Sequence, residues 1–220
     1  MTAGFDAVLF DMDGVTVETA KAWRDLERTT ILPAATNGTA PPDAIRALSV
    51  GDAYDRLVRM DDVEVTVDET GYAALYEAHA EEVYLERARL MDGYVEVLET
   101  IREANVSTGL VSASRGAWVD MVLERFDLHD VYETVVSSSD IDGPSKPAPT
   151  PYLVAADDLG ADPAQCLAVE DSPHGIDAAV AAGMDCLALR GAANTDSDLS
   201  AADAIVTSPE ELHEWITVRL

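Results

Sequence analysis

Residues 8–15 read VLFDMDGV, an apolar run suited to a buried strand that ends in two carboxylates one residue apart, Asp11 and Asp13. Two neighbouring anions do not help a buried strand, because taking charge out of water is costly unless a cation or a reaction compensates. One carboxylate can bind a hard cation or attack phosphorus, a second can move a proton, and Gly14 allows a sharp turn. The stretch therefore indicates a functional site at a strand end. The alternative is an acidic turn, because 42 of the 220 residues are Asp or Glu.

The chain is strongly acidic and nearly lacks lysine. With 220 residues, 48% of them hydrophobic, it can form one core of ordinary size and a smaller second lobe. Its formal net charge is −28, from 14 Lys and Arg against 42 Asp and Glu, whereas the net charge of a small domain usually has a magnitude of roughly 2–8. The only lysines are Lys21 and Lys146. This composition is typical of cytoplasmic proteins of halophiles, and an acidic protein from a non-halophile is the alternative.

Such a charge predicts that stability rises steeply with KCl or NaCl. At about 1 M salt the Debye length falls to about 3 Å, so long-range self-repulsion is screened while contacts at hydrogen-bond distance persist. Melting curves recorded from dilute buffer to multimolar salt measure the effect. A melting temperature that does not change with salt would contradict this prediction.

The composition also excludes several classes of partner. Binding to nucleic acid or to anionic lipid without sequence preference needs clustered Lys and Arg, and the chain has no basic run. The N-terminus lacks a signal-peptide pattern and no stretch approaches about 18 apolar residues, so we expect a cytoplasmic protein without membrane contact. Cys166 and Cys186 lie in apolar runs without metal-type spacing and are expected to be small buried residues. We expect a monomer or a small homo-oligomer.

Six short apolar runs alternate with segments of helical periodicity along most of the chain. This alternation predicts an α/β fold with a parallel sheet covered by helices on both faces. The strand candidates are Phe5–Phe10, Val106–Val111, Val131–Val136, Gln165–Val169, Asp185–Leu189 and Ala204–Val206.

One gap breaks this rhythm, because about 95 residues separate Phe10 from Val106, many more than a βα unit needs. Tyr72, Leu75, Tyr76 and His79 follow helical spacing within the gap. We therefore expect a helical lobe at residues 18–89, inserted into a core that comprises residues 1–17 and 90–220.

Polar residues follow four of the predicted strands, and in an open α/β sheet ligands bind beyond the carboxyl ends of the strands. Each type suits phosphoryl transfer. Asp11 would be the nucleophile and Asp13 the proton donor and later the base. Asp171 would share Mg²⁺ with Asp11, while Ser112 and Lys146 would bind phosphate oxygens. Taken singly, Ser112 is more often a helix cap and Lys146 a surface cation, but four such coincidences at four strand ends are improbable.

These segments resemble the four motifs of the haloacid dehalogenase (HAD) superfamily, in its phosphatase and phosphomutase branch. The first and second motifs are matched by residues 11–15 and 111–114, and the third and fourth by residues 145–149 and 169–172, with Gly175 and Gly183 in the accompanying pattern. The resemblance implies a Rossmann-like core with an inserted, mobile helical cap. It implies Mg²⁺ bound by Asp11, the backbone carbonyl of Asp13, and Asp171, with Glu170 as a further candidate. We expect the substrate to be bound by Ser112, Ala113, Ser114, Arg115 and Lys146.

Departures from the family pattern narrow the expected reaction. The dehalogenases proper lack the second Asp, so Asp13 argues against dehalogenation. The β-phosphoglucomutase branch carries a His where this chain has Trp23, and Glu18 replaces a common Asp. The sequence thus predicts a Mg²⁺-dependent phosphatase that hydrolyses a small phosphorylated metabolite, such as a sugar phosphate or phosphoglycolate, through an aspartyl phosphate.

Three alternatives remain. A β-phosphoglucomutase-like phosphomutase is the second choice. A signalling receiver domain also phosphorylates an Asp near Mg²⁺ and Lys, but it needs no 70-residue insert and places that Asp on a later strand than its acidic metal pair. A phosphate-binding module without activity has little support, because Asp11, Asp13, Lys146 and Asp171 are all present.

Overall fold

Six parallel strands form one sheet in the computed structural model, which describes residues 4–41, 43–45 and 48–220. The strand order is β5-β4-β1-β6-β7-β8, and every neighbouring pair is parallel. All six strand predictions are confirmed, with ends that shift by up to three residues. The strands are β1 (Ala7–Phe10), β4 (Ser107–Val111), β5 (Thr134–Val136), β6 (Cys166–Glu170), β7 (Asp185–Leu189) and β8 (Ala204–Val206).

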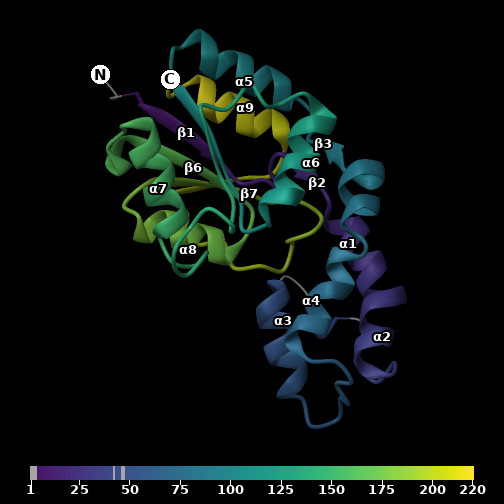
Figure 1. Cartoon of the computed structure of the whole chain (residues 1–220). Coiled ribbons are helices and arrows are strands. Elements are labelled where there is room, and N and C mark those ends of the chain that lie inside the picture. The colour runs from purple at the N-terminus through teal and green to yellow at the C-terminus, as the bar shows by residue number, and fades with distance from the viewer. Residues whose placement is uncertain (1–3, 42, 46–47) are drawn as a thin grey trace. The chain divides into compact units, whose positions relative to one another are not determined.

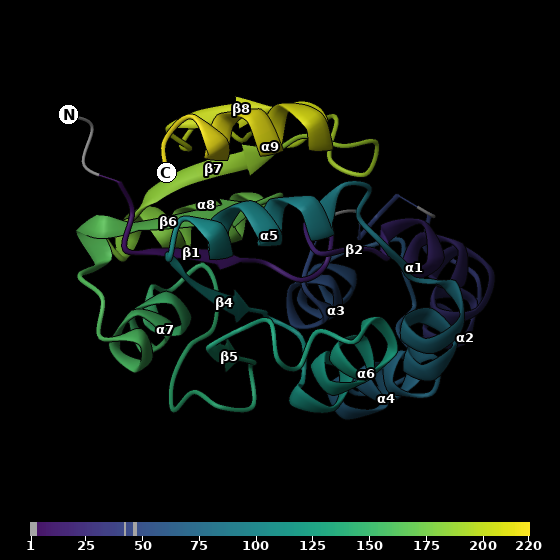
Figure 2. The ribbon, with the colours of Figure 1, turned by 90° about the horizontal axis from the view of Figure 1, so that it is seen from above.

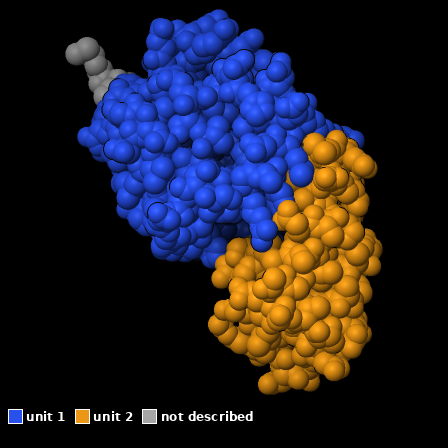
Figure 3. All heavy atoms as spheres, in the orientation of Figure 1, with its two compact units in different colours: residues 1–18, 89–220 blue, residues 19–88 orange. Residues whose placement is uncertain are grey.

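The sheet belongs to the first of two compact units into which the chain divides. Unit 1 comprises residues 1–18 and 89–220, and unit 2 comprises residues 19–88 (Figure 3). A short antiparallel pair, β2 (Val17–Glu18) and β3 (Arg89–Leu90), lies in unit 1 where the chain leaves it and returns. Unit 2 is therefore an insertion between β1 and β4.

Helices cover both faces of the sheet, as predicted for a Rossmann-like α/β fold. In Figures 1 and 2, α5 and α9 lie together on one face while α7 and α8 lie on the other, and α7 also contacts β1, β4 and β5. Pro-containing first turns begin α7, α8 and α9, where the missing N–H of proline leaves no hydrogen bond unmade. The helices of unit 1 are α5 (Tyr94–Glu103), α6 (Gly116–Phe126), α7 (Thr150–Leu159), α8 (Pro173–Ala181) and α9 (Pro209–Thr217), with a 3₁₀ turn at Pro163–Gln165.

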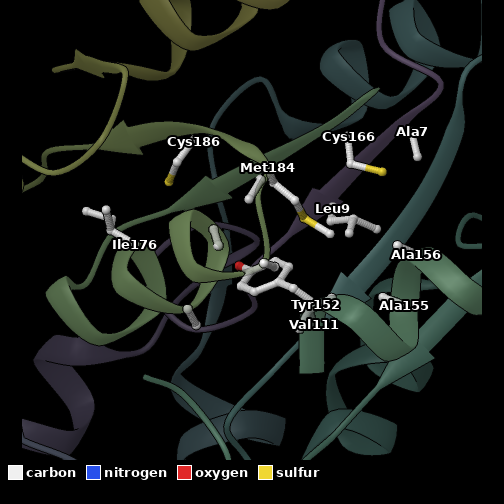
Figure 4. Close-up of a cluster of buried hydrophobic side chains, with 14 of the residues drawn as sticks. Ala7, Leu9, Val111, Tyr152, Ala155, Ala156, Cys166, Ile176, Met184 and Cys186 are labelled. Carbon is white, nitrogen blue, oxygen red and sulfur yellow. The ribbon is translucent and has the colours of Figure 1, made fainter. Parts of the chain in front are cut away.

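The core under α7 and α8 is built from alternate strand residues and small helix residues (Figure 4). Ala7 and Leu9 face this side of the sheet, as the period of two in a strand requires. The rings of Phe10 and of Tyr94 in α5 meet edge-on, with 5.3 Å between their centres. Because β1 is fully buried along its whole length, the charged residues that follow it begin where the apolar core ends. Cys166 and Cys186 are buried free cysteines.

Strand register aligns the carboxyl ends of the central strands. Phe10 pairs with Leu110 of β4 and with Val169 of β6. The residues directly beyond those pairs therefore emerge at the same edge of the sheet. This edge carries most of the residues expected to be functional.

In the residues of unit 2 that the structure describes, all regular structure is helical, as expected for the inserted lobe. An aromatic cluster holds its helices together: Trp23 contacts Tyr76 and Tyr84, and Tyr72 contacts Tyr76. Asp68 caps α4 by accepting a hydrogen bond from the N–H of Gly71 at 2.8 Å. The elements are α1 (Ala20–Leu26), a π-helix (Glu27–Ile31), α2 (Leu32–Thr36), α3 (Val50–Val58), α4 (Glu69–Glu77) and a second π-helix (Glu82–Arg87).

Within the part of the chain that the structure describes, we find no helix with the length and apolar character needed to cross a membrane.

Candidate active site

Lys146 joins residues from three strand ends into one buried cluster. Its Nζ donates hydrogen bonds to Asp11 Oδ1 and to Glu170 Oε1, both at 2.6 Å, and to the backbone oxygen of Val111 at 2.7 Å. These contacts use all three donors of the ammonium group, whose side chain is only 4% exposed. The loop after β5 thus brings this lysine to the ends of β1, β4 and β6.

Three carboxylates of this cluster fit a hard divalent cation. Asp11, Glu170 and Asp171 each offer one oxygen, and these oxygens lie within 4.8 Å of one another. Carboxylate oxygens alone are the donor set that suits Mg²⁺ rather than a softer metal. The sequence predicted Asp11 and Asp171 at such a site, with Glu170 as a further candidate, and the structure brings these three carboxylates together.

The carboxylates outnumber the cationic group facing them, and their pKa values reflect this. Burial raises the pKa of Asp11 from 3.8 to about 7, and Glu170 and Asp13 add to the rise although Lys146 opposes it. Burial, followed by the charges of Asp11 and Glu170, raises the pKa of Asp171 well above its usual value. A divalent cation would offset this excess of negative charge, because it favours the ionised carboxylates.

Gly14 allows the turn after β1 to approach the acidic cluster. Its φ is +97°, and a Cβ at this position would collide with the carboxylate of Asp171. The sequence suggested Gly14 for a sharp turn. The close approach to Asp171 is a second requirement that only the fold reveals.

The Glu170 carboxylate is held from several sides. Besides Lys146, the hydroxyl of Tyr152 donates to Oε1 at 2.7 Å, and the Asp171 N–H donates to Oε2 at 3.2 Å. Gly175 makes room for it, because a Cβ there would overlap the carboxyl group. The Nζ of Lys146 also lies 4.9 Å from the centre of the Tyr152 ring. Sequence reasoning missed Tyr152, because its position in α7 indicated only a buried aromatic residue.

The segment after β4 places a serine against Asp13. Ser114 Oγ donates to Asp13 Oδ2 at 2.8 Å, and Ser112 Oγ accepts from the Ser114 N–H at 3.0 Å. Ser112 is buried, whereas Ala113 and Arg115 are exposed in the loop that leads into α6. Ser112 does not cap that helix, whose N-cap residue is Arg115. The contact between Ser114 and Asp13 was not expected from the sequence, which pointed to substrate binding for this serine.

A buried hydroxyl network supports the turn that carries Asp11. Thr16 Oγ1 donates to the backbone oxygen of Asp11 at 2.8 Å and lies 3.1 Å from Tyr94 Oη, which lies 2.5 Å from Tyr132 Oη. Thr16 and both tyrosines are buried. No local pattern in the sequence predicts this network, because its members lie far apart along the chain and each suits an apolar core.

Comparisons with known proteins identify the family of the chain. A family model described as haloacid dehalogenase-like hydrolase matches residues 5–183. The chain is 38% identical over 111 residues to "Putative phosphatase YhcW" of Bacillus subtilis (strain 168), a match that spans about half of each chain (50% and 49%). It is 29% identical over 219 residues to "Hexitol phosphatase B" of Escherichia coli (strain K12), covering 94% of this chain and 93% of that protein.

The fold is also that of solved structures. The crystal structure of CbbY from Rhodobacter sphaeroides in complex with xylulose-(1,5)bisphosphate superposes with a TM-score of 0.78 at 20% identity, covering 93% of this chain and 94% of that chain. Because the family model spans most of the sequence, including the ends of β1, β4, β5 and β6, the chain belongs to the haloacid dehalogenase-like hydrolases.

Proposed function

We propose that the protein is a Mg²⁺-dependent phosphatase that hydrolyses a small phosphorylated metabolite through a phosphorylated Asp11. The observation that carries the proposal is the position of the Lys146 Nζ, 2.6 Å from both Asp11 and Glu170. These two carboxylates and that of Asp171 offer oxygens that lie within 4.8 Å of one another. A lysine and a cation on one carboxylate create the positive environment that a phosphoryl group requires.

Asp11 would act as the nucleophile. Its carboxylate attacks phosphorus, the bond from phosphorus to the leaving oxygen breaks, and an acyl phosphate forms on Asp11. Lys146 donates to Oδ1 of Asp11, which fixes the carboxylate in one orientation for the attack.

Asp13 would transfer the protons. It gives a proton to the leaving oxygen, then takes one from the water that attacks the acyl phosphate, so that inorganic phosphate leaves and Asp11 is restored. The hydrogen bond from Ser114 to Asp13 Oδ2 orients the carboxyl group for both steps. The cluster therefore contains a residue for each step of hydrolysis.

Asp11, Asp171 and the backbone carbonyl of Asp13 would hold the metal, with Glu170 beside them. When bound, Mg²⁺ would neutralise charge on the phosphoryl oxygens. Glu170 also orients Lys146, because that lysine donates to its Oε1.

The substrate class we propose is a sugar phosphate, an alditol phosphate or phosphoglycolate. Support comes from the similarity to "Hexitol phosphatase B" along nearly the whole chain. Lys146 would supply positive charge close to the phosphate oxygens, the backbone of residues 112–115 would bind these oxygens, and Arg115 would make a further contact with the substrate. Hydrolysis is preferred over mutase chemistry because Trp23, rather than a His, follows the second Asp by ten residues.

A phosphate-release assay over a panel of sugar phosphates, hexitol phosphates and phosphoglycolate tests the proposal, with MgCl₂ and multimolar KCl present. We expect steady release of inorganic phosphate with a clear preference for one class. Faster interconversion of hexose 1-phosphate and 6-phosphate than phosphate release would indicate a phosphomutase instead. A lasting acyl phosphate without turnover would indicate a receiver-like protein.

Metal binding should depend on pH in a defined direction. In the metal-free fold burial raises the pKa of Asp11 from 3.8 to about 7, so across that window the fold holds more protons than the unfolded chain. Metal-free stability therefore falls as pH rises through the window, and Mg²⁺ must displace protons when it binds at the lower end. At about 100 times its Kd, MgCl₂ should raise Tm by roughly 5–10 °C near pH 7.5 and by less near pH 5.5.

Thermal melts with MgCl₂ and with EDTA, at matched ionic strength, measure this difference between the two pH values. An equal shift at both pH values would contradict the assignment of these carboxylates to the metal.

A further inference from the structure

A buried asparagine connects the loop after β7 to the acidic cluster. Asn194 is 6% exposed, and its Nδ2 donates to the backbone oxygen of Asp171 at 2.6 Å and to that of Leu189 at 3.0 Å. Its Oδ1 accepts from the Gly191 N–H at 2.8 Å. Both donors of the amide are therefore used, and the side chain joins the end of β7 to the residue that follows β6.

Arg190 fixes the loop that carries this asparagine. Its Nη1 lies 3.1, 3.0 and 3.2 Å from the backbone oxygens of Asn194, Thr195 and Ser197. Its own backbone N–H donates to Val206 of β8 at 2.8 Å. A guanidinium that contacts three carbonyl groups of one loop holds that loop in one conformation. It thereby also holds the side-chain amide of Asn194 in place.

Asp171 needs such support, because it lies beyond the last hydrogen-bonded residue of β6. Its N–H is bound by Glu170 Oε2 at 3.2 Å, and its carbonyl by Asn194. Because side chains bind both of its backbone groups, these hydrogen bonds fix the backbone of Asp171, which hydrogen bonds between strands do not. The fixed backbone directs the Asp171 side chain towards Asp11 and Gly14.

We propose that Asn194 is a positioning residue for the metal site: it holds the backbone of Asp171 so that the Asp171 carboxylate meets a divalent cation beside Asp11. The inference rests on the proposed function, which assigns the cation to Asp11 and Asp171. Partners that orient metal ligands from behind typically contribute 10–100-fold to metal affinity. A loop anchor without this role would contribute to folding stability alone.

Titration of metal-free protein with MgCl₂ by isothermal calorimetry separates these roles, using Asn194→Ala and Asn194→Asp with Thr195→Ala as the control. Thr195 is exposed in the same loop, and its substitution keeps the backbone oxygen that faces Arg190. We expect Asn194→Ala to weaken Mg²⁺ binding by about 10-fold or more, and Thr195→Ala to leave it unchanged.

Asn194→Asp gives the sharper result. A new carboxylate near the site would tighten cation binding if charge alone mattered. It also replaces the two donors by acceptors that face the carbonyl groups of Asp171 and Leu189, so positioning predicts weaker binding. Tighter binding by Asn194→Asp, or a Kd for Asn194→Ala within about 2-fold of the wild type, would overturn the proposal.

Hydrogen exchange of the wild-type protein supplies a test that does not depend on the variants folding. Coupling between two sites is reciprocal, so binding of Mg²⁺ should slow exchange of the Gly191 amide, which is bound by Asn194 Oδ1. Unchanged exchange at Gly191 in a protein that binds Mg²⁺ would overturn this inference and leave the proposed function standing. Failure of the wild type to bind Mg²⁺ at all would remove the proposed metal site, and this inference with it.

Discussion

Asp11→Asn should abolish phosphate release, lowering kcat by on the order of 10⁴-fold or more, while the protein stays folded. The substitution keeps the size of the side chain and an oxygen that can accept from Lys146, but an amide cannot form the acyl phosphate. Phosphate release with the best substrate of the panel, together with circular dichroism, measures the loss against the wild type. Activity above a trace would refute the assignment of Asp11 as nucleophile.

The stability of the same variant distinguishes lost chemistry from lost structure. Burial raises the pKa of Asp11 from 3.8 to about 7, so the ionised form is unfavourable in the metal-free fold. As pH rises across that window, wild-type stability falls by a contribution that the asparagine variant lacks. In EDTA, the Tm of the variant should therefore rise relative to the Tm of the wild type as pH increases. Addition of MgCl₂ should raise the Tm of the wild type relative to that of the variant.

The fold follows from local patterns in the sequence. β1 is apolar at every position because both of its faces are covered, and the alternation of such runs with helical segments predicts a parallel sheet. The length of chain between Phe10 and Val106 alone indicates the insertion, because a βα connection cannot use so many residues. The strand predicted at Val131–Val136 begins only at Thr134. Val131 and Tyr132 have the β-branched and aromatic side chains that favour strands, but tertiary packing places them outside β5.

Part of the candidate site could also be predicted from the sequence. The sequence predicts that Asp11, Lys146, Glu170 and Asp171 lie close together, because parallel strands present their carboxyl ends at one edge. It does not predict the residues that hold these side chains in place. Ser114 and Asp13 are separated by 101 positions, and Asn194 and Asp171 by 23, so no local pattern joins them.

Lys146→Met should both abolish phosphate release and destabilise the fold. Burial alone would lower the pKa of Lys146, but Asp11 and Glu170 outweigh it and raise the pKa above its usual value. The charged lysine therefore contributes stability throughout the neutral range, lost only as pH rises past its raised pKa. Removing one partner of a buried ion pair costs about 3–5 kcal/mol, and urea unfolding in EDTA near pH 7.5 measures this loss.

The other lysine of the chain provides a matched control. Lys21 is exposed in α1, so Lys21→Met makes the same chemical change where water already solvates the charge, and its effect on unfolding should stay within about 0.5 kcal/mol. The loss for Lys146→Met should also shrink near pH 5, where Asp11, whose pKa burial raises to about 7, binds a proton and needs the cation less. Because Asp11→Asn removes one of the two carboxylates that Lys146 neutralises, it should relieve part of the loss in the double variant. Equal losses at positions 21 and 146, or strictly additive effects at positions 11 and 146, would mean that Lys146 does not balance the buried charge of this site.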